Sequence, residues 1–205
     1  MHAMPTSFAS HLLIAMPAMD DPNFRHAVAL LCQHDEGGAM GIVINRVSEY
    51  TLGELLAQMD IVAGDAALAD AGVLTGGPVQ PERGFVLHDD PREWNSTLRL
   101  APGLAVTTSR DILDAMARGD GPPNALVALG YAGWGAGQLE AELAQNSWLT
   151  VPVDDRCPGS KPRPRVAACQ RSASGVRNRI ASSAGTVSQL FCASSASSWP
   201  APQPA

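Results

Sequence analysis

The sequence predicts an α+β fold, in which a mixed and mostly antiparallel sheet has a few helices interspersed among its strands. Short apolar runs bounded by Gly, Pro, Asn and Asp recur along the chain, and such runs are typical of strands. Several are joined by short glycine-containing loops, which favour antiparallel hairpins. Only about three segments have apolar residues at helical spacing. Because strands and helices do not alternate regularly, a doubly wound parallel sheet is not expected.

The region 104–149 shows this pattern most clearly, because residues typical of strand and helix ends mark every junction. The elements predicted there are, in order, a strand over 104–107, a helix capped by Thr108 or Ser109 and ended by Gly119, a buried strand over 125–129, a tight glycine-rich turn over 130–137 and a helix carrying Leu139 and Leu143. Asp111 falls in the first turn of the first helix, where a carboxylate interacts favourably with the helix dipole.

Two further features organise the first third of the chain. The apolar runs 26–32 and 40–45 are separated by Gly37-Gly38 and predict a hairpin, whose second strand is apolar on both faces and therefore lies centrally in the sheet. Thr51 and Glu54 have the spacing of a capping box, which predicts a helix start. The remaining predictions are strands over 10–15, 73–75, 84–88, 96–100 and 148–151, a loop over 60–71, a sharp turn over 76–79 and a polar connection over 89–95.

The charge of the chain divides near Pro152. Residues 1–153 contain seven Arg, no Lys and 18 acidic residues, a net charge of −11, whereas residues 154–205 carry a net charge of +5. The second segment is rich in Ser and Pro and has no sustained helical or strand period. Such a segment buries too little apolar surface to offset an ordering entropy of ~1–2 kcal/mol per residue. We therefore predict one folded domain over 1–153 and a disordered tail over 154–205.

The composition of residues 154–205 is also consistent with two alternatives. Their Arg and Lys residues fit an arm that binds nucleic acid or membrane, although the charges are scattered and aromatic residues are few. The abrupt change of composition after a well-patterned strand also fits a shifted reading frame, in which case the segment is not a natural C-terminus. The three cysteines of the segment lack the spacing of a metal site.

Composition excludes several classes of function. No apolar run approaches the ~18 residues of a membrane span, and the first residues lack the basic and apolar regions of a signal peptide. Cys32 has no second cysteine within residues 1–153, so we expect a cytoplasmic protein without a disulfide framework. A domain of net charge −11 without Lys repels DNA unless its Arg residues gather on one face, so direct nucleic-acid binding is not expected.

Two polar clusters are candidate ligand sites. The segment 107–111 places three hydroxyl groups, Arg110 and Asp111 at a helix start, which is more than capping requires and leaves room for an anion or a polar ligand. His88 beside Asp89 is the best acid–base candidate in the domain. No serine in a nucleophile elbow accompanies it, so no catalytic residue is assigned.

The remaining polar and glycine-rich features are typical of structural roles. Arg46 and Arg83 lie beside predicted buried strands, where ion pairs with acids such as Asp111 or Glu82 are common. The glycines of 133–137 lack the spacing of a dinucleotide or phosphate loop and favour a close strand-to-helix crossing. The histidines of the domain fit no metal-ligand spacing, so neither a metal nor a cofactor is expected.

Several segments resemble the YqgE/AlgH family of bacterial proteins, in the order in which that family has them, over roughly residues 8–152. They are His11-Leu12-Leu13-Ile14-Ala15-Met16-Pro17, Asp21-Pro22-Asn23-Phe24, Gly38-Ala39-Met40-Gly41-Ile42-Val43-Ile44-Asn45-Arg46, Gly76-Gly77-Pro78-Val79, Arg83-Gly84-Phe85-Val86-Leu87-His88, Thr107-Thr108-Ser109-Arg110-Asp111 and Gly130-Tyr131-Ala132-Gly133-Trp134.

The resemblance implies a bacterial cytosolic protein whose compact α+β fold has a bifurcated or barrel-like sheet surrounded by helices. It also implies one more patterned helix after Pro152, where this chain instead turns to its Ser/Pro/Arg-rich segment. Members are often labelled transcriptional regulators, and the family brings no established catalytic or cofactor residues. The positions that match its motifs give a hypothesis for a ligand site: Asn45, Arg46, Gly76, Gly77, Pro78, Arg83, His88, Thr108, Ser109, Arg110, Tyr131 and Trp134.

Three functions are consistent with the sequence. The first is a non-enzymatic regulator that affects gene expression indirectly, through a protein partner or a small ligand. The second is a small-ligand-binding protein or enzyme that uses a polar cleft around Ser109, Arg110 and His88. The third, a regulator that binds DNA directly, conflicts with the acidic domain.

Overall fold

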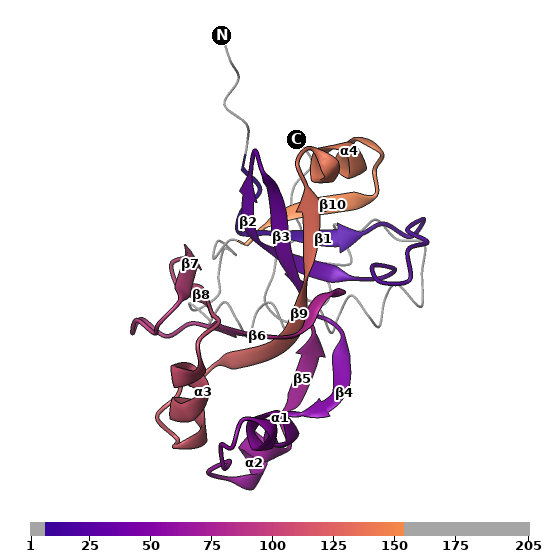
Figure 1. Ribbon diagram of the computed structural model, residues 1–205. Helices are drawn as coiled ribbons and strands as arrows, with labels where there is room; N and C mark the ends of the chain where they lie inside the picture. Colours follow the sequence, from indigo (N-terminus) through magenta and orange to yellow (C-terminus); the bar gives the residue numbers. More distant parts are fainter. Residues whose placement is uncertain (1–6, 154–205) are drawn as a thin grey trace, which may run out of the picture.

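The structure, a computed structural model, describes residues 7–153, which form one ten-stranded sheet with four helices (Figure 1). The elements are β1 (His11–Ala15), β2 (Val28–Asp35), β3 (Gly38–Val43), β4 (Val47–Thr51), α1 (Leu52–Gln58), α2 (Ala66–Ala69), β5 (Gly72–Thr75), β6 (Val79–His88), β7 (Thr97–Ala101), β8 (Leu104–Thr107), α3 (Arg110–Ala117), β9 (Ala125–Gly135), α4 (Gln138–Ala144) and β10 (Trp148–Pro152). Neighbouring strands follow the order β10-β1-β2-β3-β9-β6-β8-β7, with β5 paired to β9 and β4 to β5. Only the β5–β9 pair is parallel among the described strands, which confirms the mostly antiparallel sheet.

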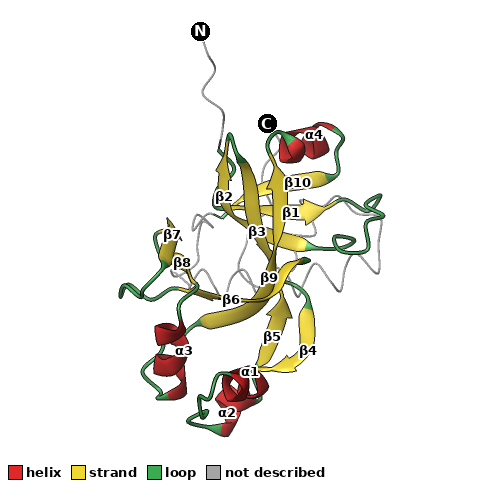
Figure 2. Cartoon of the chain, viewed as in Figure 1, coloured by secondary structure: helices red, strands yellow, loops and turns green. Residues whose placement is uncertain are grey.

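The long strand β9 joins two halves of the sheet. One edge of β9 pairs with β6. The other edge pairs first with β5, at Ala128 and Leu129, and then with β3, over 132–135. The sheet therefore forks at Gly130. We call β1, β2, β3, β10 and α4 the first lobe, and β4 to β8 with α1 to α3 the second lobe; β9 belongs to both (Figure 2).

The backbones at the fork lie too close together for side chains. Gly76 donates its N–H to the Leu129 carbonyl oxygen and accepts a hydrogen bond from β3, so it ties the two branches together. A Cβ on Gly76 would lie 2.3 Å from the Gly130 carbonyl oxygen, and a Cβ on Gly77 would lie 2.2 Å from the Tyr131 carbonyl carbon. The Gly76-Gly77 pair therefore serves a close backbone crossing, which only glycine permits without a shift of the chain.

Three apolar clusters hold the curled sheet. One sheet face of both lobes encloses a cluster that includes Leu30, Ile42 and Phe85. The opposite face of the first lobe carries a cluster that includes Trp134 and is covered by α4. The opposite face of the second lobe packs against α1 and α3. The helices therefore cover separate patches at the two ends of the molecule, and the expectation that helices surround the sheet is not confirmed (Figure 2).

Most predicted elements form near their predicted positions. β2 and β3 make the expected hairpin, and β3 lies between β2 and β9 in the interior of the sheet. Thr51 and Glu54 make both hydrogen bonds of the predicted capping box at α1. Gly119 follows α3 with φ +81°, as expected of a glycine that ends a helix. The strand–helix–strand–helix order of 104–149 is also confirmed.

The structure differs from the predictions in three places. The turn predicted over 130–137 forms only at 136–137, because β9 continues to Gly135 and pairs with β3 along the way. The glycines indicated a turn by local propensity, but pairing with β3 keeps the backbone extended. The predicted loop 60–71 contains the short helix α2, whose start is capped by the Asp65 carboxylate accepting the Leu68 N–H at 2.7 Å. β4 was also not predicted, since it is short and mostly exposed.

The predicted disordered tail, the alternative of a basic arm and the shifted reading frame all concern residues 154–205, which lie outside the described part of the chain. The same holds for the three cysteines of that segment. Within residues 7–153, no helix has the length and apolar character needed to cross a membrane.

Candidate functional site

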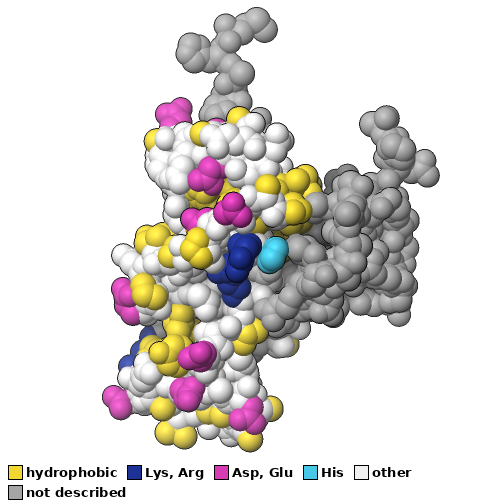
Figure 3. All heavy atoms as spheres, turned by 90° about the vertical axis from the view of Figure 1, so that its right-hand side faces the viewer, with side chains coloured by type: hydrophobic (Ala, Val, Ile, Leu, Met, Phe, Trp, Pro, Cys, Tyr) yellow, Lys and Arg dark blue, Asp and Glu magenta, His cyan; other side chains and the backbone are white. Residues whose placement is uncertain are grey.

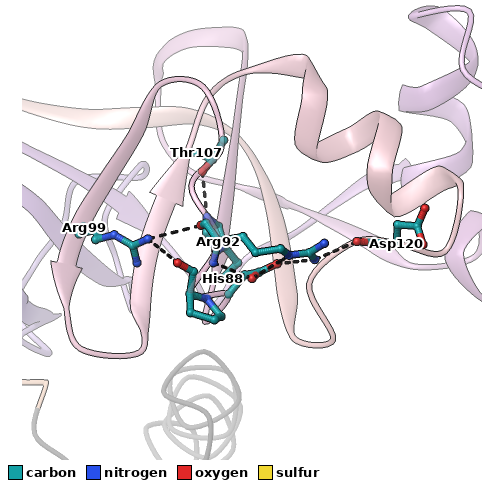
Figure 4. A network of polar contacts seen from close by, with 7 residues as sticks. His88, Arg92, Arg99, Thr107 and Asp120 are labelled. Carbon is teal, nitrogen blue, oxygen red and sulfur yellow. Dashed lines mark hydrogen bonds and ion pairs between the residues drawn. The ribbon is translucent and has the colours of Figure 1, made fainter.

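His88 and Thr107 form a buried hydrogen-bonded pair in the second lobe. His88 ends β6 and Thr107 ends β8; both are 0% exposed, and His88 Nε2 lies 2.8 Å from Thr107 Oγ1 (Figure 4). Thr107 Oγ1 lies 2.7 Å from Thr97 Oγ1 on β7, and Thr97 donates to the Trp94 carbonyl oxygen at 2.8 Å. The strand register brings these side chains together, because Thr97 lies directly opposite Thr107.

The directions of these hydrogen bonds place the protons. The Thr97 hydroxyl donates to a carbonyl oxygen, so it accepts from Thr107, which in turn accepts from the Nε2–H of His88. Burial lowers the pKa of His88, which favours the neutral imidazole over the protonated one. A histidine that activates a hydroxyl must present an unprotonated nitrogen to it. The pair therefore has the reverse of the arrangement that nucleophilic catalysis requires.

Two arginines close the connection between β6 and β7 next to this pair (Figure 4). Arg92 contacts both carboxylate oxygens of Asp90, at 2.6–3.0 Å, and donates to the Asp120 carbonyl oxygen at 2.8 Å. Arg99 donates to the Pro91 carbonyl oxygen at 2.7 Å. The hydrogen bond from Arg92 lowers the pKa of Asp90, which is nearly completely buried. These hydrogen bonds and this ion pair fix the conformation of the connection between β6 and β7.

The start of α3 is an internal hydrogen-bonded corner. Ser109 is the N-cap residue, but the predicted side-chain cap is wrong, because its hydroxyl contacts the Asn95 carbonyl oxygen and the Asp111 carboxylate instead. Asp111 also accepts the Asn95 N–H at 2.9 Å. Burial raises the pKa of Asp111, whereas its hydrogen bonds, first of all the one from Ser109, lower it. Together the hydrogen bonds outweigh burial, so the pKa of Asp111 lies below its usual value. Arg110 is exposed and pairs with Asp114 at 3.6 Å, while Thr108 is exposed beside it.

Asn45 and Arg46 bind backbone groups in the first lobe. The Asn45 carbonyl oxygen accepts the Val28 N–H at 3.0 Å, and its amide donates to the His26 carbonyl oxygen at 2.8 Å. The Arg46 guanidinium donates to the carbonyl oxygens of Pro22, at 3.3 Å, and Arg25, at 2.9 Å. Both side chains therefore fasten the turn that precedes β2.

The expected ion pairs of Arg46 and Arg83 with Asp111 or Glu82 do not form among the described residues. Arg83 donates to the Gln80 side-chain oxygen at 3.3 Å, and its guanidinium carbon lies 5.5 Å from the centre of the Phe85 ring. The other residues of the predicted site around the fork are the buried glycines described above and the exposed Pro78 that follows them.

Tyr131 and Trp134 belong to the apolar packing of β9. The Tyr131 ring meets Phe85 edge to face, with ring centres 5.9 Å apart. Trp134 is 5% exposed and donates its indole N–H to Glu142 Oε2 at 3.0 Å. Trp148 donates to the same oxygen at 2.7 Å. Glu142, which the sequence pattern did not indicate, therefore links two indoles of one aromatic cluster.

The predicted site residues thus fall into separate groups. His88 and Ser109 lie near each other. His88 is linked through Thr107 and Thr97 to the Trp94 carbonyl oxygen, and Ser109 contacts the carbonyl oxygen of the next residue, Asn95. Asn45 and Arg46 bind a different part of the chain, around residues 22–28. Sequence reasoning missed Thr97, Asp90 and Glu142, since their partners lie on strands and loops whose register local pattern does not reveal. In residues 7–153, no group of three or more His, Cys, Asp or Glu side chains is placed to hold a metal ion.

Comparison with known proteins identifies the family. The AlgH-like family model matches residues 12–170, more than half of the chain. The chain belongs to the AlgH-like family. Its AlgH-like relatives include the UPF0301 protein Smlt1098 of Stenotrophomonas maltophilia, 65% identical over 154 residues, and the UPF0301 protein XCC2748 of Xanthomonas campestris pv. campestris, 64% identical over 154 residues. In both cases the match covers 75% of this chain and 82% of the relative.

Two solved structures share the fold. The solution structure of the AlgH protein from Pseudomonas aeruginosa is 44% identical, has a TM-score of 0.65, and the match covers 91% of this chain and 99% of that chain. The crystal structure of protein DIP2367 from Corynebacterium diphtheriae, at 21% identity and a TM-score of 0.55, covers 74% of this chain and 78% of that one and supports the fold alone. The predicted membership of the YqgE/AlgH family is confirmed.

Proposed function

We propose that this AlgH-like protein is a non-enzymatic regulator that affects gene expression indirectly, by binding a protein partner or a small ligand. The observation that carries the proposal is that the side chains capable of catalysis are already hydrogen-bonded within the fold. His88 is buried with its N–H toward Thr107, and the Ser109 hydroxyl contacts Asp111. A catalytic centre needs groups that reach a substrate, and these groups reach one another instead.

The charge of the domain supports an indirect role. Affinity for DNA comes mainly from Lys and Arg side chains that neutralise phosphates. Residues 1–153 contain seven arginines and 18 acidic residues. Arg92, Arg99 and Arg110 are in ion pairs with Asp or Glu, which leaves still less positive charge for a polyanion. Contact with a protein or a small ligand does not depend on such an excess of positive charge.

A deletion and complementation experiment tests this function. In Stenotrophomonas maltophilia K279a, the gene for the relative Smlt1098 is deleted, and this chain is supplied from a plasmid. We expect a defined set of transcripts to change on deletion and to return with the wild-type chain and with the exposed-site variant Arg110→Ala. Unchanged transcripts would contradict regulation, and failure of Arg110→Ala alone would favour the polar site around Ser109, Arg110 and His88.

A binding measurement separates indirect from direct regulation. The purified full chain is titrated against duplex DNA from the promoters of the affected genes, by fluorescence anisotropy at low and at physiological salt. We expect no specific binding at either salt concentration. Tight binding that weakens steeply with salt would show direct contact with phosphates and would contradict the proposal.

A further inference from the structure

Two arginines form a positively charged spot on the acidic domain. The Arg46 guanidinium donates to the carbonyl oxygen of Arg25, so the two residues are in contact. Burial, followed by the nearby charge of Arg25, lowers the pKa of Arg46, while Asp21 acts more weakly in the opposite direction. Among the described residues, neither guanidinium has a carboxylate within 4.0 Å. The positive charge of the pair is therefore not neutralised by an ion pair of the fold.

The turn that carries Arg25 is fixed by hydrogen bonds and by an aromatic contact. Asn45 and Arg46 bind its carbonyl oxygens, as described above, and the Arg25 N–H donates to the Asp21 carbonyl oxygen at 2.7 Å. Phe24 anchors the turn through its ring, which stacks on Trp134 at 5.9 Å between ring centres. The two residues after this anchor, Arg25 and His26, are exposed. A fixed turn presents its charges at a smaller entropic cost on binding than a mobile loop would.

Exposed apolar side chains follow Arg46 in the chain, on β4. Val47, which follows Arg46 directly, is 60% exposed, and Tyr50 is 54% exposed. Figure 3 shows, on one face of the molecule, Arg side chains with a His beside them and acidic side chains above and below. Exposed Asp20, Asp21 and Glu49 belong to the same segments. We call Arg25, His26, Arg46, Val47 and Tyr50 the Arg25 surface.

We propose that the Arg25 surface is the docking site for a short acidic and apolar segment of a partner protein. Guanidinium groups bind carboxylates well, and Arg and Tyr are enriched among residues that dominate protein interfaces. Val47 and Tyr50 offer apolar contact that a free anion would not use. The surrounding acidic residues repel an extended polyanion such as DNA but leave room for a few carboxylates next to the arginines. This inference rests on the proposed function and names the chemistry of its partner.

A peptide titration tests the docking site. The full chain, labelled with ¹⁵N, is titrated with a short peptide that alternates Glu with Phe and Leu, and the backbone amide shifts are followed. We expect the changes to cluster at residues 21–26 and 45–50, and the affinity to fall at higher ionic strength. The same peptide with Gln in place of Glu should bind about tenfold more weakly, as expected for the loss of charge-assisted contacts.

Variants of matched charge localise the effect. Arg25→Glu changes an exposed side chain and should weaken peptide binding about tenfold or more, while Arg118→Glu, the same charge change at the end of α3, should leave it nearly unchanged. A double change of Val47→Thr and Tyr50→Ser should also weaken binding with the fold intact, as judged by the amide spectrum. Equal effects of Arg25→Glu and Arg118→Glu would overturn the proposal.

Two other probes distinguish the class of ligand. Inorganic phosphate that binds at residues 25 and 46 as tightly as the peptide would overturn a protein partner in favour of a small anion. Duplex DNA that shifts the same amides would overturn it in favour of nucleic acid. If the peptide binds as expected while deletion in the bacterium changes no transcripts, the docking site stands and the regulatory function fails.

Discussion

At the scale of single residues, buried polar groups are oriented by chains of hydrogen bonds. Thr97, Thr107 and His88 form one such chain, whose direction is set by the Trp94 carbonyl oxygen. His88 Nδ1 is buried and has no hydrogen-bond partner among the described residues. The protonated imidazole would therefore be poorly accommodated, which makes His88 a source of pH-dependent stability.

We expect the free energy of unfolding to fall between pH 7 and pH 5 because of His88. The unfolded chain takes up a proton near the ordinary histidine pKa of about 6.5, whereas burial lowers the pKa of His88 in the folded chain. Stability is therefore present above about 6.5 and is lost as the pH falls toward the lower folded value. Urea unfolding at several pH values should show a flatter profile for His88→Gln than for the wild type, and parallel profiles would contradict this assignment.

Glu142 provides a second prediction at this scale. Its Oε2 accepts the indole N–H groups of Trp134 and Trp148, at 3.0 and 2.7 Å. Glu142→Ala leaves both donors without this partner and should destabilise the protein by about 2–3 kcal/mol in urea unfolding. Glu36→Ala, at the exposed tip of the β2–β3 hairpin, is the control and should change stability by less than about 0.5 kcal/mol. Similar losses in the two variants would argue against the indole contacts.

At the scale of secondary-structure elements, the fork depends on two glycines that precede β6. Gly76→Ala should destabilise the protein by about 2–4 kcal/mol, because its Cβ would lie 2.3 Å from the Gly130 carbonyl oxygen and the backbone must move. Gly84→Ala, in β6, has no atom within 4 Å of the added Cβ and should be neutral within about 1 kcal/mol. Urea denaturation of both variants checks this, and a tolerated Gly76→Ala would mean that the crossing can relax.

Elements with strong local signals could be predicted from the sequence, and elements defined by long-range pairing could not. The capping box at Thr51, the β2–β3 hairpin and the glycine after α3 are local, and each was predicted correctly. The extension of β9 through Gly135 depends on pairing with β3, nearly a hundred residues earlier, which outweighs the turn propensity of its glycines. The same holds for the candidate site: the Thr107–His88 contact depends on strand register, so it could not be predicted from local sequence.

At the scale of the whole molecule, excess negative charge acts against folding. Residues 1–153 carry a net charge of −11, and the described residues form only three ion pairs between Arg and acidic side chains. Self-repulsion of this kind is screened by salt. We expect the midpoint temperature of thermal unfolding to rise when the salt concentration is raised from low to physiological. A fall would show that the ion pairs around Asp90 outweigh the general repulsion.

Because both lobes share β9, we expect the domain to unfold as one cooperative unit. A lobe that unfolded alone would remove the strands that pair with its part of β9, the strand on which the other lobe is also built. The amides in the middle of β9 should therefore exchange with deuterium only when the entire domain opens, and their exchange rates should report the global free energy of unfolding. The terminal strand β10, hydrogen-bonded to β1 alone among the described strands, is free to fray on its own and to exchange earlier.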